Sequence, residues 1–257
     1  MAAISAEFNS AKSCPHPIFA DMNTTPLLLL PGLMCNEAFW APLLQALPQG
    51  INARVVDYGD SDTITAMAQG ALANAPPRFA LAGHSMGGRV ALEVVRLAPE
   101  RVSRLILMDT GYLALAGGEA GAKERAGRMA LLDVARRDGV RAMCTEWVKG
   151  MVHPARLGDA ALINPILEMF SNKDADRFAR QLSALLTRPD ASPVLASLTL
   201  PTMLMCGRQD SWASVAQHEA MQKLAPHAVL SVIEDAGHMV LMEQPDTTAR
   251  AILNFLA

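Results

Sequence analysis

Short apolar runs recur along the chain from Leu27 onward, and each is followed by a stretch in which apolar residues return every three or four positions. Runs of Val, Leu, Ile and Met without polar alternation are typical of strands buried on both faces of a parallel sheet. The pattern predicts strands over 26–30, 53–57, 79–82, 105–108, 202–206 and 229–233. It predicts helices over 38–47, 64–75, 86–97, 213–224 and 247–256. This alternation indicates repeated βαβ units around one sheet.

Two segments fall outside this alternation. Residues 1–24 contain Pro15 and Pro17 and show no periodicity, so we expect an irregular leader there. Residues 112–198 are too many for one crossover between strands, and their pattern is mostly helical. This segment predicts a helical cap, inserted into a core that is formed by residues 25–111 and 199–257.

Composition narrows the class of partner. A chain of 257 residues that is 51% hydrophobic can form one large core. Its net charge of -3, with no basic stripe, argues against nucleic acid and favours a small-molecule partner. The four cysteines lie far apart without C-x-x-C spacing, which indicates neither a zinc site nor a disulfide framework. With no apolar run near the roughly 20 residues of a membrane span, we expect a cytoplasmic protein without a membrane partner.

The segment Gly83-His84-Ser85-Met86-Gly87 has the form G-x-S-x-G and lies between a predicted strand and a predicted helix. At such a turn the serine Oγ is exposed at the carboxyl edge of the sheet, and the small neighbours permit a strained backbone. The amino end of the following helix favours negative charge beside Ser85. The alternative is a glycine-rich turn with an incidental serine, but the strand-turn-helix context favours a nucleophile.

A serine nucleophile needs a base to take its proton, and the resulting imidazolium needs an anionic partner. Asp210 follows the fifth predicted strand, and His238 follows the sixth. Taken singly, Asp210 could cap a helix and His238 could be a surface histidine. Their placement at successive strand ends, in the order Ser, Asp, His, favours a catalytic triad. Asp109 and Asp235 are rival acids, and Asp109 also stands at a strand end.

The oxyanion formed in acyl transfer requires donors already in place, usually backbone N–H groups. Met86, directly after the nucleophile, is one candidate. Leu33 is the other, because Gly32 lets the chain turn after the first strand; an ordinary βα turn is the alternative. The residues near these positions are mostly apolar and predict an apolar acyl pocket, although core packing explains the methionines equally well. The candidates for substrate binding are Met34, His84, Trp147, Met151, Trp212 and Met239.

With these motifs in view, residues 25–257 resemble the α/β-hydrolase superfamily, particularly small bacterial carboxylesterases, pimeloyl-carrier-protein methyl esterases and enol-lactonases. The resemblance rests on the elbow at Ser85, the G-x-x-D segment that ends at Asp210, and the G-H pair at His238. It implies an α/β-hydrolase fold. The antiparallel hairpin that usually precedes the first strand has no counterpart before Leu27, so we expect six mostly parallel strands in the order 2-1-3-4-5-6. The strand order then reverses beside the first strand, where Leu33 and Ser85 would meet.

The resemblance implies a serine hydrolase that cleaves a carboxylic ester, thioester or lactone of a small to medium apolar acyl group through an acyl-enzyme. It implies neither a metal nor an organic cofactor. One alternative is a C–C bond hydrolase or lyase that uses the same triad on a carboxylated diketone, with a cationic side chain such as Arg180 for the carboxylate. Another is a non-catalytic binding module. The fold by itself does not determine the substrate.

Overall fold

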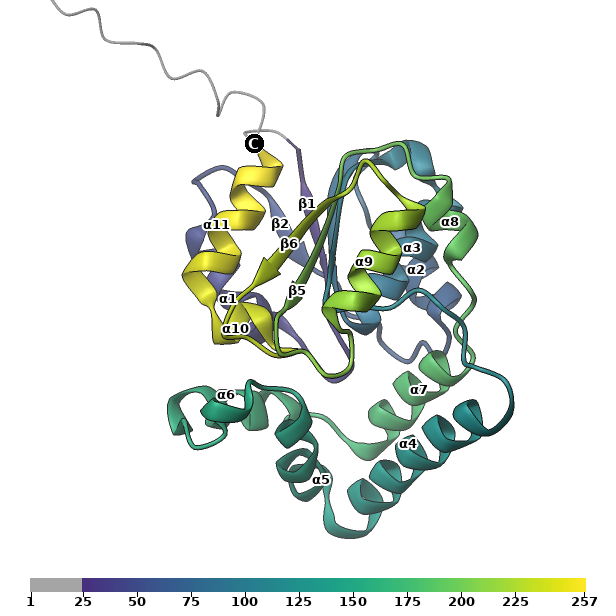
Figure 1. The fold of residues 1–257 in the computed structure, drawn as a ribbon, viewed down its shortest axis with the longest axis vertical. Helices are drawn as coiled ribbons and strands as arrows, with labels where there is room; N and C mark the ends of the chain where they lie inside the picture. The colour runs from purple at the N-terminus through teal and green to yellow at the C-terminus, as the bar shows by residue number, and fades with distance from the viewer. Residues whose placement is uncertain (1–24) are drawn as a thin grey trace, which may run out of the picture.

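The computed structural model describes residues 25–257, and the leader predicted for residues 1–24 lies outside them. The described residues form one six-stranded sheet in the order β2-β1-β3-β4-β5-β6 (Figure 1). Every pair of neighbouring strands is parallel. The predicted fold class and strand order are therefore confirmed. The strands are β1 (Leu27–Leu30), β2 (Ala53–Val55), β3 (Phe79–His84), β4 (Val102–Met108), β5 (Thr202–Gly207) and β6 (Val229–Ile233).

The central strand β3 is longer than the apolar pattern predicts. β3 continues through Gly83 to His84, where these residues pair with Leu107 and Met108 of β4. Glycine and histidine have little strand propensity, so the pattern alone ends the strand too early. The added ladder carries the regular sheet up to the residue before Ser85.

Helices cover both faces of the sheet. α1 (Glu37–Ala46) and α11 (Pro245–Leu256) pack against each other on one side, and α2 (Ile64–Ala73), α3 (Met86–Leu97) and α9 (Val215–Leu224) lie on the other (Figure 1). α9 begins later than predicted because the Ser214 side chain accepts a hydrogen bond from the Gln217 N–H and caps the helix there. The short helix α10 (Val240–Glu243) follows β6, and η1 (Pro99–Arg101) precedes β4.

The segment between β4 and β5 is helical, as the pattern predicts. α4 to α7 lie beyond the end of the sheet at which β5 and β6 finish, whereas α8 lies beside α3 and α9 (Figure 1). The division into a core and a cap at residues 112 and 198 stays a prediction. No helix of residues 25–257 combines the length and apolar character needed to cross a membrane. The elements of this segment are α4 (Gly118–Asp138), α5 (Val140–Trp147), η2 (Val148–Gly150), η3 (Pro154–Arg156), α6 (Ala160–Ser171), α7 (Ala175–Leu186) and α8 (Ser192–Ala196).

Candidate active site

Ser85 stands at the sharp turn between β3 and α3, with φ 55° and ψ -116°. A residue with a side chain rarely adopts this region, so the turn must be held by its surroundings. The Ser85 N–H donates to the Met108 carbonyl at 2.8 Å, and the Ser85 carbonyl accepts from Thr110 Oγ1 at 2.6 Å. These contacts to the end of β4 fix the strained turn and leave the Ser85 side chain partly exposed.

The two glycines of the motif permit close backbone contacts. A Cβ atom on Gly83 would clash with the carbonyl of Gly87, and one on Gly87 would clash with the carbonyl of Leu30 in β1. Larger residues would therefore separate α3 from β1 and β3. The requirement for glycine comes from packing as well as from the turn itself.

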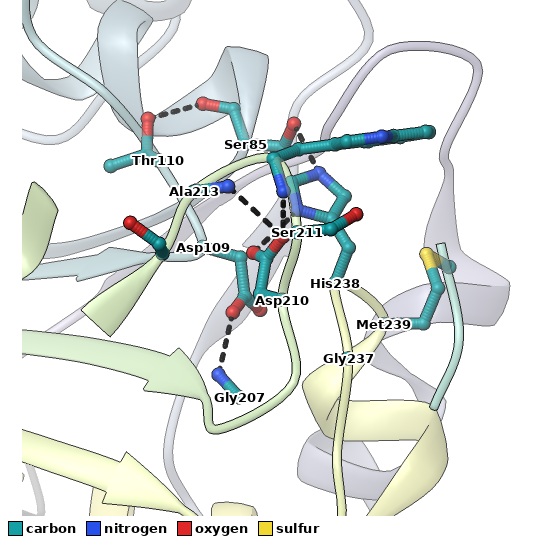
Figure 2. A network of polar contacts seen from close by, with 12 residues as sticks. Ser85, Asp109, Thr110, Gly207, Asp210, Ser211, Ala213, Gly237, His238 and Met239 are labelled. Atoms are coloured by element: carbon teal, nitrogen blue, oxygen red, sulfur yellow. Dashed lines mark hydrogen bonds and ion pairs between the residues drawn. The ribbon is translucent and has the colours of Figure 1, made fainter. Parts of the chain in front are cut away.

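The structure brings Ser85, His238 and Asp210 together at the carboxyl ends of β3, β6 and β5 (Figure 2). Ser85 Oγ lies 2.8 Å from His238 Nε2, and His238 Nδ1 lies 2.7 Å from Asp210 Oδ2. Asp210 Oδ1 accepts hydrogen bonds from the N–H groups of Trp212 at 2.8 Å and Ala213 at 3.0 Å. One carboxylate oxygen is thus anchored by backbone, and the other is directed at the imidazole.

The surroundings of Asp210 favour its charged form. Burial acts to raise the pKa of this carboxyl, but the neighbouring His238 and the two backbone N–H groups outweigh burial, so the pKa lies below its usual range. Asp210 is therefore ionised at neutral pH. An ionised, oriented carboxylate stabilises an imidazolium at His238.

Neither rival acid contacts His238. Asp109 is fully buried, and its Oδ1 accepts from the Gly207 N–H at 2.9 Å. Its Oδ2 has no hydrogen-bond partner in the described part of the chain. Burial, and then the charge of Asp210, raise the pKa of Asp109 well above its usual range, which favours the neutral form of this group. Asp235 is exposed on the loop before His238.

His84, a predicted substrate-binding residue, is buried, and its ring contacts the backbone carbonyl of His238. Its Nε2 lies 2.8 Å from the His238 carbonyl oxygen, and its ring stacks on Phe39 with centroids 3.9 Å apart. Burial and the proximity of His238 lower the pKa of His84 to about 3. The ring is therefore neutral, and Nε2 must carry its proton in order to donate to a carbonyl. In this structure His84 supports the backbone of His238.

The loop after β1 lies directly against the nucleophile. A Cβ atom on Gly32 would stand 3.2 Å from the Cβ of Ser85. The backbone N–H groups of Leu33 and Met86, the predicted oxyanion donors, have no acceptor among residues 25–257. Both groups are thus free to bind a developing negative charge beside Ser85.

The other predicted pocket residues differ in exposure. Trp212 is 42% exposed, and its ring centroid lies 5.0 Å from that of His238. Trp147 stacks on Trp212 at 5.8 Å with an interplanar angle of 22°. Three methionines are buried in the interior around the triad, which accords with core packing: Met34, Met151 and Met239. Contact of these five side chains and of His84 with substrate stays a prediction.

Several polar residues near the site were not identified from the sequence. Thr110 holds the Ser85 turn, Glu243 contacts the loop that bears His238, and Gln181 of α7 contacts the loop after β1. Thr110 lies two residues after the end of β4, which is a signal that the sequence offers. Glu243 and Gln181 have no such signal, because each acts through contacts made only in the folded chain.

Residues 27–251 match the alpha/beta hydrolase family. The chain belongs to this family. A pimeloyl-[acyl-carrier protein] methyl ester esterase of Photobacterium profundum is 27% identical over 243 residues, which cover 90% of this chain and 94% of that protein. A relative of the esterase/lipase type from Haemophilus influenzae is 28% identical over 180 residues, covering 68% of this chain and 59% of the relative.

Solved structures agree with this assignment. An esterase of Thermogutta terrifontis superposes with a TM-score of 0.80 at 25% identity, covering 91% of this chain and 90% of that one. The predicted resemblance to the α/β-hydrolases is confirmed, as is the prediction of a hydrolase of the esterase type.

Proposed function

We propose that the chain hydrolyses carboxylic esters through an acyl-enzyme in which Ser85 is the nucleophile, His238 the base and Asp210 the orienting acid. The observation that carries this proposal is the continuous hydrogen-bonded chain from Ser85 Oγ through the His238 ring to Asp210 Oδ2, with distances of 2.8 and 2.7 Å. The similarity to esterases supports it.

In the proposed reaction, His238 Nε2 takes the proton of Ser85 Oγ as the oxygen attacks the acyl carbon. The N–H groups of Leu33 and Met86 bind the oxyanion, and Asp210 stabilises the imidazolium. His238 then gives its proton to the departing alkoxide as the ester C–O bond breaks. His238 then takes a proton from a water molecule as the water oxygen attacks the acyl carbon. The bond between the acyl carbon and Ser85 Oγ breaks, His238 returns the proton to Ser85 Oγ, and the carboxylic acid departs.

The substrate that we propose is a small molecule with a small to medium, uncharged acyl group. Arg180, the candidate cation for a carboxylated diketone, is already paired, as is its neighbour Arg177 on α7. Arg180 lies 2.8 Å from Asp60, and Arg177 contacts Asp57. These ion pairs between α7 and the loop after β2 favour an ester over the substrate of a C–C bond hydrolase.

A hydrolysis screen tests this proposal. p-Nitrophenyl esters, thioesters, lactones and vinylogous diketones are offered to the wild type, to Ser85→Ala, and to Ser183→Ala as a control on α7. We expect the wild type and Ser183→Ala to hydrolyse short esters equally, and Ser85→Ala to lose activity by a factor on the order of 10⁴ to 10⁶.

A fluorophosphonate probe gives a second readout that is independent of substrate choice. It should label the wild type and fail to label Ser85→Ala. Labelling or turnover retained in a well-folded Ser85→Ala variant would reject the mechanism. A strong preference for the vinylogous diketone over the esters would show that the proposed substrate class is wrong.

A further inference from the structure

A buried glutamine of α7 is hydrogen-bonded to the backbone of the loop after β1. Gln181 is 3% exposed, and its Oε1 accepts a hydrogen bond from the Met34 N–H at 2.8 Å. Because the partner is an N–H group, the side-chain amide must present its oxygen. The bond joins a helix inserted between β4 and β5 to the residue next to Leu33.

The contacted residue is the strained position of a tight turn. The Cys35 N–H donates to the Gly32 carbonyl at 3.0 Å, so residues 32–35 form a β-turn with Leu33 and Met34 at its centre. Met34 has a φ of 61°. A positive φ at the third residue is the mark of a type II turn, in which glycine is preferred at that position. Methionine adopts it only where the surroundings compensate.

The hydrogen bond from the Met34 N–H favours one form of the turn over the other. A type II turn becomes a type I turn when the peptide between its two central residues rotates by roughly half a revolution, which gives the third residue an ordinary negative φ. That rotation would direct the Met34 N–H away from Gln181. Because Met34 is fully buried, its N–H would lose a partner that water cannot replace. Gln181 therefore favours the strained form.

We propose that Gln181 is a positioning residue, which anchors the turn at residues 32–35 to α7 and thereby holds the Leu33 N–H in its place beside Ser85, where the oxyanion forms. This inference rests on the proposed function, in which Leu33 is an oxyanion donor. The Leu33 N–H belongs to the peptide between Gly32 and Leu33, which is adjacent to the peptide between Leu33 and Met34 that Gln181 binds. Displacing a catalytic group by about 1 Å can reduce the rate on the order of 100-fold, so acyl transfer depends on α7 being docked.

Three variants test the proposal on the full chain. Gln181→Met keeps the length of the side chain but has no acceptor for the Met34 N–H. Gln181→Glu restores an acceptor oxygen, and Ser183→Ala is a neighbouring change on the same helix. The measurements are kcat per active site, titrated with a fluorophosphonate, KM for p-nitrophenyl butyrate, and the inhibition constant of a trifluoromethyl ketone, which forms a tetrahedral adduct with serine.

We expect Gln181→Met to lower kcat about 10- to 100-fold and to change KM less than about threefold. The inhibition constant of the trifluoromethyl ketone should rise by the same factor by which kcat falls. Gln181→Glu should recover most of kcat, and Ser183→Ala should match the wild type. A merely structural role would lower the melting temperature and the number of titrated sites but leave kcat per site unchanged, and that result would overturn the inference.

The two proposals fail in different ways. If Gln181→Met equals the wild type while turnover still requires Ser85, the positioning role is wrong and the proposed function stands. If wild-type turnover does not require Ser85, both are wrong.

Discussion

Glu243 binds the backbone on both sides of His238. Its Oε1 accepts hydrogen bonds from the N–H groups of Gly237 at 2.9 Å and Met239 at 3.1 Å. Its Oε2 accepts from the His153 N–H at 2.6 Å. Glu243 is 2% exposed, so these bonds are shielded from water. One carboxylate thus fixes the loop that bears His238 and ties it to the segment between η2 and η3.

Glu243→Gln should lower both the stability of the protein and its activity, because the loop that bears His238 loses support. An amide has only one oxygen, so either the His238 loop or the His153 N–H loses its acceptor and meets an NH₂ group instead. We expect a loss of about 1–3 kcal/mol in the free energy of unfolding, measured by urea denaturation, together with a lower kcat. Glu219→Gln, an exposed change on α9, is the control and should alter neither quantity. Equal stability of Glu243→Gln and the wild type would show that the buried bonds contribute little.

Asp210→Asn should cost far more activity than Asp109→Asn. An amide at position 210 no longer stabilises an imidazolium at His238 and permits the wrong tautomer of the ring, which reduces kcat on the order of 10⁴-fold. The Asp109 side chain bonds the Gly207 N–H and not the imidazole, so an amide of the same shape should leave kcat within about tenfold. Asp235→Asn on the exposed loop should have little effect. Steady-state kinetics on the three variants decides the ranking, and a reversed order would assign the acid to Asp109.

The stability of the protein should depend on pH through Asp109. Its pKa is raised by burial and by Asp210, so the folded state holds a proton that the unfolded state releases above a pH of about 4. The contribution of Asp109 to stability is therefore fully present below that pH and declines as the pH rises toward the folded pKa. Asparagine does not titrate and also tolerates the φ of 45° at this position.

We therefore expect Asp109→Asn to gain stability relative to the wild type as the pH increases from 5 to 8. Melting temperatures measured at intervals across this range test the expectation. A difference that stays constant with pH would mean that Asp109 is ionised in the folded protein.

Trp212→Ala should change acyl-chain preference. The exposed indole lies beside the His238 ring, where a bound acyl chain can bury apolar surface against it. We expect kcat/KM for p-nitrophenyl octanoate to fall about fivefold or more and that for the acetate to fall less. Trp212→Phe retains an aromatic ring and should lie between the two. An equal loss for every chain length would assign Trp212 to the support of His238 instead.

The sequence by itself determined the architecture and the three residues of the proposed triad. Buried parallel strands appear as unbroken apolar runs, and Ser85, Asp210 and His238 each lie within five residues of the end of one of these runs. Since the carboxyl ends of parallel strands meet at one edge of a sheet, that topological rule brings all three residues together. The glycines around Ser85 likewise indicate that the turn requires small residues.

Tertiary structure decided which of two strand-end carboxyls contacts the base. Asp109 and Asp210 both follow strands, but the Asp109 side chain is directed at the Gly207 N–H and the Asp210 side chain at the imidazole. The contacts of Gln181 and Glu243 likewise appeared only in the folded chain. Residues separated by as many as 147 positions meet in these bonds. Periodicity describes neighbours along one element, so it contains no information on which distant backbone N–H group a buried side chain will bind.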